Sequence, residues 1–182
     1  MDAKLLQELK KSKKIAMARG FNLPISTKSS VHVARYIKFL PLNKAKRILK
    51  EVIEKRRAIP YFRYNRDIPH RKELDGPVKS GRYPVKVAKY FLRLLNSVEK
   101  NAQFLGLNTE KMIIIHSAAY KGVKPPARMD YRGRIIRGKS THIEIIAMEV
   151  DQYDPSKRYS RKAFKKLIKD ILKEWYLKVS KK

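Results

Sequence analysis

The fold is decided by residues 112–150, which read MIIIHSAAYKGVKPPARMDYRGRIIRGKSTHIEIIAMEV. The two ends of this stretch are apolar and rich in β-branched residues, which predicts two β-strands, 112–119 and 141–150. Residues 120–140 between them carry seven lysines or arginines and a single acidic residue, Asp130. We therefore predict a long hairpin that extends away from the body by roughly 30 Å, at ~3.3 Å per residue.

The composition is strongly basic. The 182 residues include 45 Lys and Arg against 16 Asp and Glu, a formal net charge of +29, and 43% of them are hydrophobic, enough for a folded core. A compact chain with this excess charge repels itself, so we expect a partner with dense negative charge, and nucleic acid fits best. The lack of cysteine excludes disulfides and thiol nucleophiles. No apolar run reaches the ~18 residues of a membrane span, and we expect a cytoplasmic protein.

Helical spacing of apolar residues predicts five helices. Their segments are 5–17, 26–40, 43–55, 84–105 and, after Pro155, 164–176. Asn43 is the predicted N-cap of the third helix, and Pro84 is the predicted first residue of the fourth. The last helix has an apolar face that includes Trp175 and Tyr176, which fits a membrane surface but fits packing on the body better. Helices and strands together predict an α+β fold.

A long loop is predicted between Ile59 and Tyr83, because the prolines and glycines there leave no room for a regular element of ordinary length. Loops of this length inside a compact domain are usually functional or disordered. Its aromatic and guanidinium planes favour stacking on nucleic-acid bases. They belong to Tyr61, Phe62, Arg63, Tyr64, Arg66, Arg71, Arg82 and Tyr83.

Residues 133–140, GRIIRGKS, match the P-loop pattern that binds nucleotide phosphates. A P-loop needs a helix immediately after it, because the helix N-terminus helps to hold the phosphates. The residues that follow Ser140 alternate like a strand instead. We interpret the match, Lys139 included, as chance within a basic hairpin, and keep nucleotide binding only as an alternative.

Neither a metal site nor a catalytic centre is indicated. The four histidines lie on separate predicted elements, and only His116 and His142 could approach each other across the hairpin. The acidic residues fall among basic ones at i, i+4 spacing, as in Glu51 with Lys55, which is typical of ion pairs on a helix surface. We therefore expect neither an enzyme nor a cofactor.

The basic residues of the hairpin have too few apolar neighbours to pack, so an external partner must order them. Arginine offers bidentate donors and a stacking plane, and RNA is commonly recognised through its shape, its backbone and its unpaired bases. RNA is therefore the favoured partner. A DNA-compacting protein is the alternative, because its charge requirement is the same.

A series of ordered motifs then resembles one known family. The motifs are ARG at 18–20, LPIS at 23–26, AIPYFRYNR at 58–66, LDG at 74–76, GRYPVK at 81–86, residues 96–101 with GL at 106–107, IH at 115–116, KG at 121–122, GR at 133–134 and HIEI at 142–145. Over residues 18–150 the chain resembles the large-subunit ribosomal proteins numbered twenty-two in the universal nomenclature, in their archaeal and eukaryotic form.

The resemblance implies a three-stranded antiparallel sheet packed by three helices, with the third strand near Asn22 to Ser26 and the hairpin over 113–148. It implies a structural protein of the large ribosomal subunit that supports subunit assembly and lines the nascent-peptide exit tunnel with its hairpin. The expected partners are large-subunit ribosomal RNA, neighbouring ribosomal proteins and the nascent polypeptide, without a membrane or a homo-oligomer. Residues 1–17 and 151–182 would flank this domain as a basic N-terminal extension and a basic C-terminal helix.

Composition and resemblance together give two sets of expected contact residues. Those expected to bind ribosomal RNA are Arg19, Lys28, Arg63, Tyr64, Asn65, Arg66, His70, Arg71, Arg82, Lys121, Lys124, Arg128, Arg132, Arg134, Arg137 and Lys139. Those expected at the tip of the hairpin, inside the tunnel, are Arg128, Met129, Asp130, Tyr131, Arg132, Gly133 and Arg134.

Overall fold

The computed structural model describes residues 14–74, 76–151, 153–154 and 159–180. Its centre is a three-stranded antiparallel sheet in the order β1-β7-β4, built from β1 (Ile15–Leu23), β7 (Thr141–Glu149) and β4 (Met112–Lys121). The central strand is thus β7, the last strand of the described chain, and its Glu144 lies opposite Arg19 on one side and Ala118 on the other. The predicted α+β class is confirmed.

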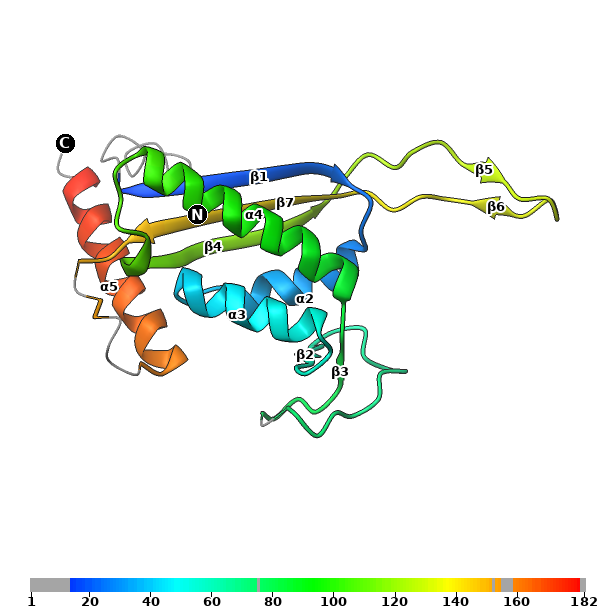
Figure 1. The fold of residues 1–182 in the computed structure, drawn as a ribbon, viewed down its shortest axis with the longest axis horizontal. Coiled ribbons are helices and arrows are strands. Elements are labelled where there is room, and N and C mark those ends of the chain that lie inside the picture. Colours follow the sequence, from blue (N-terminus) through cyan, green and yellow to red (C-terminus); the bar gives the residue numbers. More distant parts are fainter. Residues whose placement is uncertain (1–13, 75, 152, 155–158, 181–182) are drawn as a thin grey trace.

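Three helices cover one face of the sheet (Figure 1). They are α2 (Thr27–Ile37), α3 (Leu42–Ile53) and α4 (Val85–Phe104). Leu49 of α3 and Phe91 and Leu95 of α4 are fully buried in one cluster with Ile114 and Ile145 of the sheet. This inner face therefore holds the main core, as the apolar stripes of the three helices require.

A second hydrophobic cluster lies on the opposite, outer face of the sheet, where α5 (Arg161–Ser180) packs. Phe164 and Ile168 of α5 contact a patch formed by Ile113, Ile115 and Ile146. At this end β7 is buried on both faces, which strand alternation alone does not indicate. The last helix packs on the body as predicted, although the side chains of Trp175 and Tyr176 lie outside the described part of the structure.

Two projections leave the body at the end away from α5 (Figure 1). One is the hairpin between β4 and β7, whose outer end is a two-stranded ladder of β5 (Arg128–Met129) and β6 (Ile135–Ile136). The other is the loop after α3, which starts at β2 (Ile59–Pro60) and ends at β3 (Gly81–Arg82), two short strands that pair with each other. A 3₁₀ turn, η1 (Thr109–Lys111), precedes β4.

Two predictions near the N-terminus are wrong. Ile15 to Met17 are not helical: they begin β1, because pairing with β7 places Ile15 and Met17 on the outer cluster and Ala16 on the inner core. This part of the predicted extension therefore belongs to the sheet, while residues 1–13 lie outside the described residues. The third strand covers Ile15–Leu23 rather than Asn22 to Ser26. It ends there because Asn22 has a left-handed backbone, with φ of 47°, and Pro24 cannot donate a ladder hydrogen bond.

The capping and ion-pair predictions for α3 also need correction. Pro41, not Asn43, is the N-cap, and the helix already starts at the fully buried Leu42. Glu51 does not pair with Lys55, because α3 ends at Ile53 and Lys55 then adopts a positive φ of 61°. The i, i+4 geometry that the ion pair needs is therefore lost.

Candidate nucleic-acid interface

The loop between β2 and β3 is anchored to α2 by ring stacking. The ring of His32 on α2 stacks on Tyr61 with 4.2 Å between centroids, and its Nδ1 accepts a hydrogen bond from the backbone N–H of Phe62 at 3.4 Å. Burial lowers the pKa of His32, and the nearby positive charge of Arg35 lowers it further. Tyr61 is only 3% exposed. It therefore holds the loop in place and is not available to stack on a base.

Beyond this anchor, cations lie over the aromatic rings that the loop exposes. The guanidinium of Arg35 is 4.5 Å from the Phe62 centroid, and Nζ of Lys28 is 5.0 Å from that of Tyr64. The Tyr64 ring is 70% exposed on a residue with φ of 55°. Stacked rings and cations of this kind are suited to bases and phosphates. Arg35 was not predicted as a contact residue; it lies one helical turn from His32, and this position on α2 is the signal that could have found it.

A basic hollow of about 670 Å³ lies further along the loop, lined by His70, Arg71, Lys72 and Lys79 together with Leu74 and Gly76. The Arg71 guanidinium lies 5.1 Å from the Tyr83 centroid, and its Nε is buried without a hydrogen-bond partner. Tyr83 in turn donates to the Glu73 carboxylate, and this hydrogen bond raises the pKa of the Tyr83 hydroxyl. Because basic side chains line most of it, this hollow is suited to an external anion.

The hairpin is held at its tip by its own backbone. The N–H of Gly133, a residue with φ of 73°, donates to the carbonyl of Asp130 at 2.9 Å, and the Asp130 carboxylate accepts from the N–H of Tyr131 at 2.8 Å. Arg132 lies over the Tyr131 ring at 5.1 Å. Residues 133–140 thus form a turn and a strand that lead into β7. Without a helix after it, this segment lacks the geometry of a P-loop, as the sequence pattern indicated.

The basic side chains of the hairpin are all exposed, as are the apolar side chains at its outer end. The cations are Lys121, Lys124, Arg128, Arg132, Arg134, Arg137 and Lys139. Met129, Tyr131 and Ile135 are between 65% and 83% exposed. From Val123 to Lys139 no described residue is buried. The cations and apolar side chains of the hairpin are therefore accessible to a partner, and the hairpin has no hydrophobic core of its own.

The predicted contact residues fall into two groups and one exception. Arg63, Tyr64, Asn65, Arg66, His70 and Arg71 lie on the loop, with Lys28 and Arg82 next to it, and the remaining cations lie on the hairpin. Arg19 belongs to neither group. Its Nη2 lies 2.7 Å from Oε1 of Glu144, the residue opposite it on β7, and this cross-strand ion pair already neutralises it.

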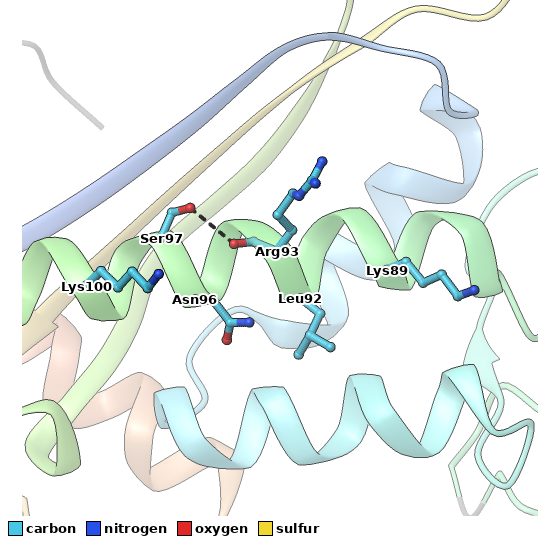
Figure 2. A pocket seen from close by; sticks show the side chains of 6 residues that line it. All are labelled: Lys89, Leu92, Arg93, Asn96, Ser97 and Lys100. Carbon is cyan, nitrogen blue, oxygen red and sulfur yellow. Dashed lines mark hydrogen bonds between the residues drawn. The ribbon is translucent and has the colours of Figure 1, made fainter.

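A further basic hollow, of about 410 Å³, lies along the exposed side of α4. Figure 2 shows Lys89, Arg93 and Lys100 spaced along the helix, with Leu92 and Asn96 pointing toward α3. These cations were not predicted as contact residues. Their spacing, opposite the apolar stripe, was visible but is also what any solvated helix face shows.

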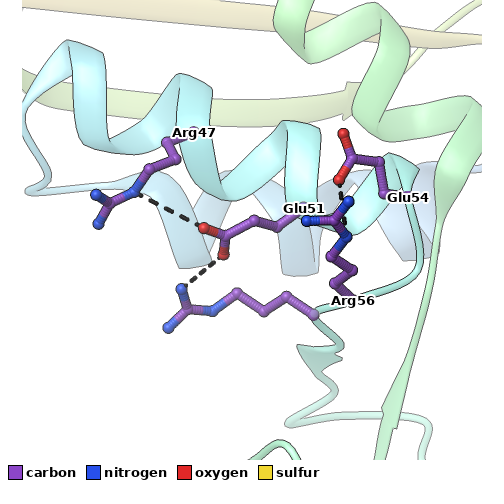
Figure 3. A network of polar contacts seen from close by, with 5 residues as sticks. Arg47, Glu51, Glu54 and Arg56 are labelled. Carbon is purple, nitrogen blue, oxygen red and sulfur yellow. Dashed lines mark hydrogen bonds and ion pairs between the residues drawn. The ribbon is translucent and has the colours of Figure 1, made fainter.

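The few acidic residues of the body are mostly neutralised by neighbouring cations. At the end of α3, Glu51 contacts both Arg47 and Arg57, at 3.7 and 2.9 Å, and Glu54 contacts Arg56 at 3.1 Å (Figure 3). Such exposed pairs contribute little to stability, about 0–1 kcal/mol each. Their main consequence is that the excess charge of the surface stays positive.

The described residues hold no group of three His, Cys, Asp or Glu side chains that could bind a metal ion. His142 lies opposite Tyr120 in the sheet, whereas His116 lies opposite Ile146, so the two histidines do not face each other. Among the described helices, none combines the length and the apolar composition that a membrane span requires.

Comparison with known proteins gives the family. The family model described as ribosomal protein L22p/L17e matches residues 18–148. The chain belongs to this family. The resemblance seen in its motifs is thereby confirmed, and with it the prediction that the chain is a ribosomal protein and not an enzyme.

The chain is similar to three archaeal proteins named "Large ribosomal subunit protein uL22". The one from Nanoarchaeum equitans is 46% identical over 157 residues, which cover 84% of this chain and 89% of the relative. Those from Thermofilum pendens and Methanoculleus marisnigri are 43% and 40% identical, over 71% and 75% of this chain and 86% and 90% of the relatives. The similarity thus extends over most of both chains.

Proposed function

We propose that this protein is a structural component of the large subunit of the cytoplasmic ribosome and that it binds large-subunit ribosomal RNA through two projections, the loop between β2 and β3 and the hairpin between β4 and β7. The family and the names of the archaeal relatives support the ribosomal assignment. The DNA-compacting alternative accounts for the charge alone, whereas the ribosomal assignment accounts for the charge and the family together.

The observation that carries the proposal is the composition of the hairpin. Seven cations and a single carboxylate, that of Asp130, lie between Tyr120 and Ser140. No residue from Val123 to Lys139 is buried. An arm of this kind gains nothing from burial, so its rigidity must come from a polyanion that surrounds it. Ribosomal RNA provides such surroundings, and the assembled RNA domains would gain a cationic bridge between them.

We further propose that the outer end of the hairpin, Arg128 to Arg134, lines the nascent-peptide exit tunnel. The exposed Met129 and Tyr131 offer apolar surface to a passing polypeptide, and Arg132 and Arg134 offer charge to the RNA wall. The inner part of the hairpin, the loop and neighbouring ribosomal proteins would fix this end in position. A single RNA-binding domain with flanking segments remains part of this proposal, with its N-terminal bound moved from residue 18 to Ile15, where β1 begins.

The test is binding of the purified full chain to large-subunit ribosomal RNA and to duplex DNA of equal length, over a series of salt concentrations. We expect tighter binding to the ribosomal RNA, with affinity that falls by orders of magnitude as salt rises, because about ten phosphates are contacted. Crosslinking in intact particles should join the hairpin to RNA and its tip to a stalled nascent chain. Equal or tighter binding to DNA would favour the alternative.

A further inference from the structure

One row of the outer sheet face carries an aromatic side chain on each strand. In the β4–β7 ladder Tyr120 lies directly opposite His142, and on the other side of β7 the ring of Phe21 from β1 contacts the His142 ring edge-on, with 5.6 Å between centroids. The three rings thus come from three adjacent strands and lie side by side across the sheet, next to the base of the hairpin.

All three rings are on the outer face. For His142 strand alternation decides this, because Ile143 and Ile145 of β7 belong to the inner core. Phe21 lies where the register of β1 shifts, between Gly20 and Leu23, and its ring contact with His142 places it on the same face. Tyr120 shares the face of His142 because directly opposed residues in an antiparallel pair do so. The helix α5 covers this face only at the other end of the sheet, with Phe164 and Ile168.

The row is exposed and fixed. Phe21 and Tyr120 are 67% and 51% exposed, although aromatic side chains of soluble proteins usually bury much of their surface. The His142 ring is held by the backbone N–H of Asn22, which donates to Nδ1 at 3.2 Å. Since Nδ1 accepts, the proton of the neutral ring is on Nε2, which is thus a hydrogen-bond donor. The exposed rings of Phe21 and Tyr120 thus lie on either side of the His142 imidazole.

The charge around the row decides which partner it fits. The adjacent carboxylate, Glu144, is neutralised by Arg19, and the hairpin that starts at the row carries Lys121, Lys124 and Lys139 at its inner end. A partner on this face would thus meet exposed rings bordered by unneutralised cations. Unpaired RNA satisfies both requirements, because its bases stack on rings while its phosphates meet the cations.

We propose that Phe21, His142 and Tyr120 form a stacking platform for unpaired nucleotides of RNA, separate from the loop and from the tip of the hairpin. The inference rests on the proposed RNA binding and adds to it a site, a ligand class and a mode of recognition. Base stacking on a sheet tolerates different bases, so the platform selects single-stranded over duplex RNA rather than one sequence.

The test uses the full chain and three probes: a single-stranded oligouridylate, a duplex RNA of equal length and large-subunit ribosomal RNA. The double variant Phe21→Ala, Tyr120→Ala removes the two exposed rings. For oligouridylate we expect a roughly 5- to 150-fold loss of affinity for each stacked base. The salt dependence should stay that of the wild type, since no charge is removed. The conservative variant Phe21→Trp should retain binding.

Phe104→Ala is the matched control, because Phe104 is a phenylalanine 91% exposed at the end of α4, away from the row. Thermal unfolding of each variant shows that it folds. If the double variant and the control bind oligouridylate as tightly as the wild type, while ribosomal RNA is still bound, the platform is refuted and the proposed function stands. An equal loss on duplex RNA also refutes it. A wild type that fails to bind ribosomal RNA refutes the proposed function itself.

Discussion

The two ends of the β4–β7 pair differ in what surrounds them. At one end, Ile113, Ile115 and Ile146 pack under α5 while Ile114 and Ile145 pack under the three inner helices, so both faces are buried. At the other end the same two chain segments continue into a hairpin without a buried residue between Val123 and Lys139. The comparison teaches that one pair of strands can be buried on both faces at one end and continue into an arm without a core at the other.

The largest effect is expected from removing charge at the hairpin end. Replacement of Arg128, Arg132, Arg134 and Arg137 by Ala should weaken binding to ribosomal RNA by ~1,000-fold, at about 1 kcal/mol for each lost contact. The slope of log affinity against log salt should fall by about 3 to 4. Thermal unfolding should not change, because none of these side chains is buried. A large loss of stability would show that the hairpin does have internal packing.

The second prediction concerns the body end. Phe164→Ala should cost about 3 kcal/mol or more of unfolding free energy, because Phe164 is 3% exposed in the outer cluster and its loss leaves a cavity. Chemical denaturation measures this. RNA affinity of the folded variant should stay near that of the wild type. The exposed neighbour Lys165→Ala is the control, for which we expect a change within about 0.5 kcal/mol.

The third prediction concerns Gly122, which lies where β4 ends and the exposed hairpin begins. A Cβ there would lie closer to Oγ of Ser140 than van der Waals contact allows and 3.0 Å from Oδ1 of Asn22. Gly122→Ala should therefore destabilise the protein by about 1–3 kcal/mol through overpacking. Ser140→Ala removes the clashing oxygen, so the double variant should be less destabilised than the two single changes add up to. Strict additivity in this cycle would contradict the close contact.

The smallest effect is a pH dependence at the anchor of the loop. Burial lowers the pKa of His32 below its ordinary value of 6.5, so the unfolded chain binds more protons as pH falls through 6.5. The stabilisation is present above pH 6.5 and is lost as pH falls from there toward the folded-state pKa, by about 1.4 kcal/mol for each unit of difference between the two values. His32→Asn should reduce the pH dependence of the unfolding free energy between pH 7 and 5, as measured by chemical denaturation. The pH dependence that remains is due to His116, whose pKa is also lowered by burial.

The sequence predicted the regular elements well where a single period dominates. Apolar spacing located α2, α3 and α4, and β-branched runs located β4 and β7, with the largest error at the end of α2, which stops at Ile37 and not at residue 40. It misassigned Ile15 to Met17, because a short apolar segment fits either period and only pairing with β7 decides. The outer cluster was not located either, because Ile146 occupies a strand position that alternation assigns to solvent. In the structure α5 covers this position.

The candidate interface was predictable in composition but not in geometry. Cations and rings between Ile59 and Tyr83 indicated a contact loop, yet which rings are exposed depends on α2. Tyr61 is buried because it stacks on His32, whereas Tyr64 is exposed next to Lys28. Likewise, the row formed by Phe21, Tyr120 and His142 joins residues that are distant in the chain, and only the register of three strands brings them together.

The position of β7 between β1 and β4 has a consequence for synthesis. The two outer strands of this sheet, β1 and β4, cannot pair with each other when they leave the ribosome, since each needs the central strand, which is translated after the whole hairpin. Until then their apolar edges stay open, a state prone to aggregation. Such late, long-range closure makes folding slow. The edges of β1 and β4 thus stay unpaired in a newborn chain until its final third has emerged.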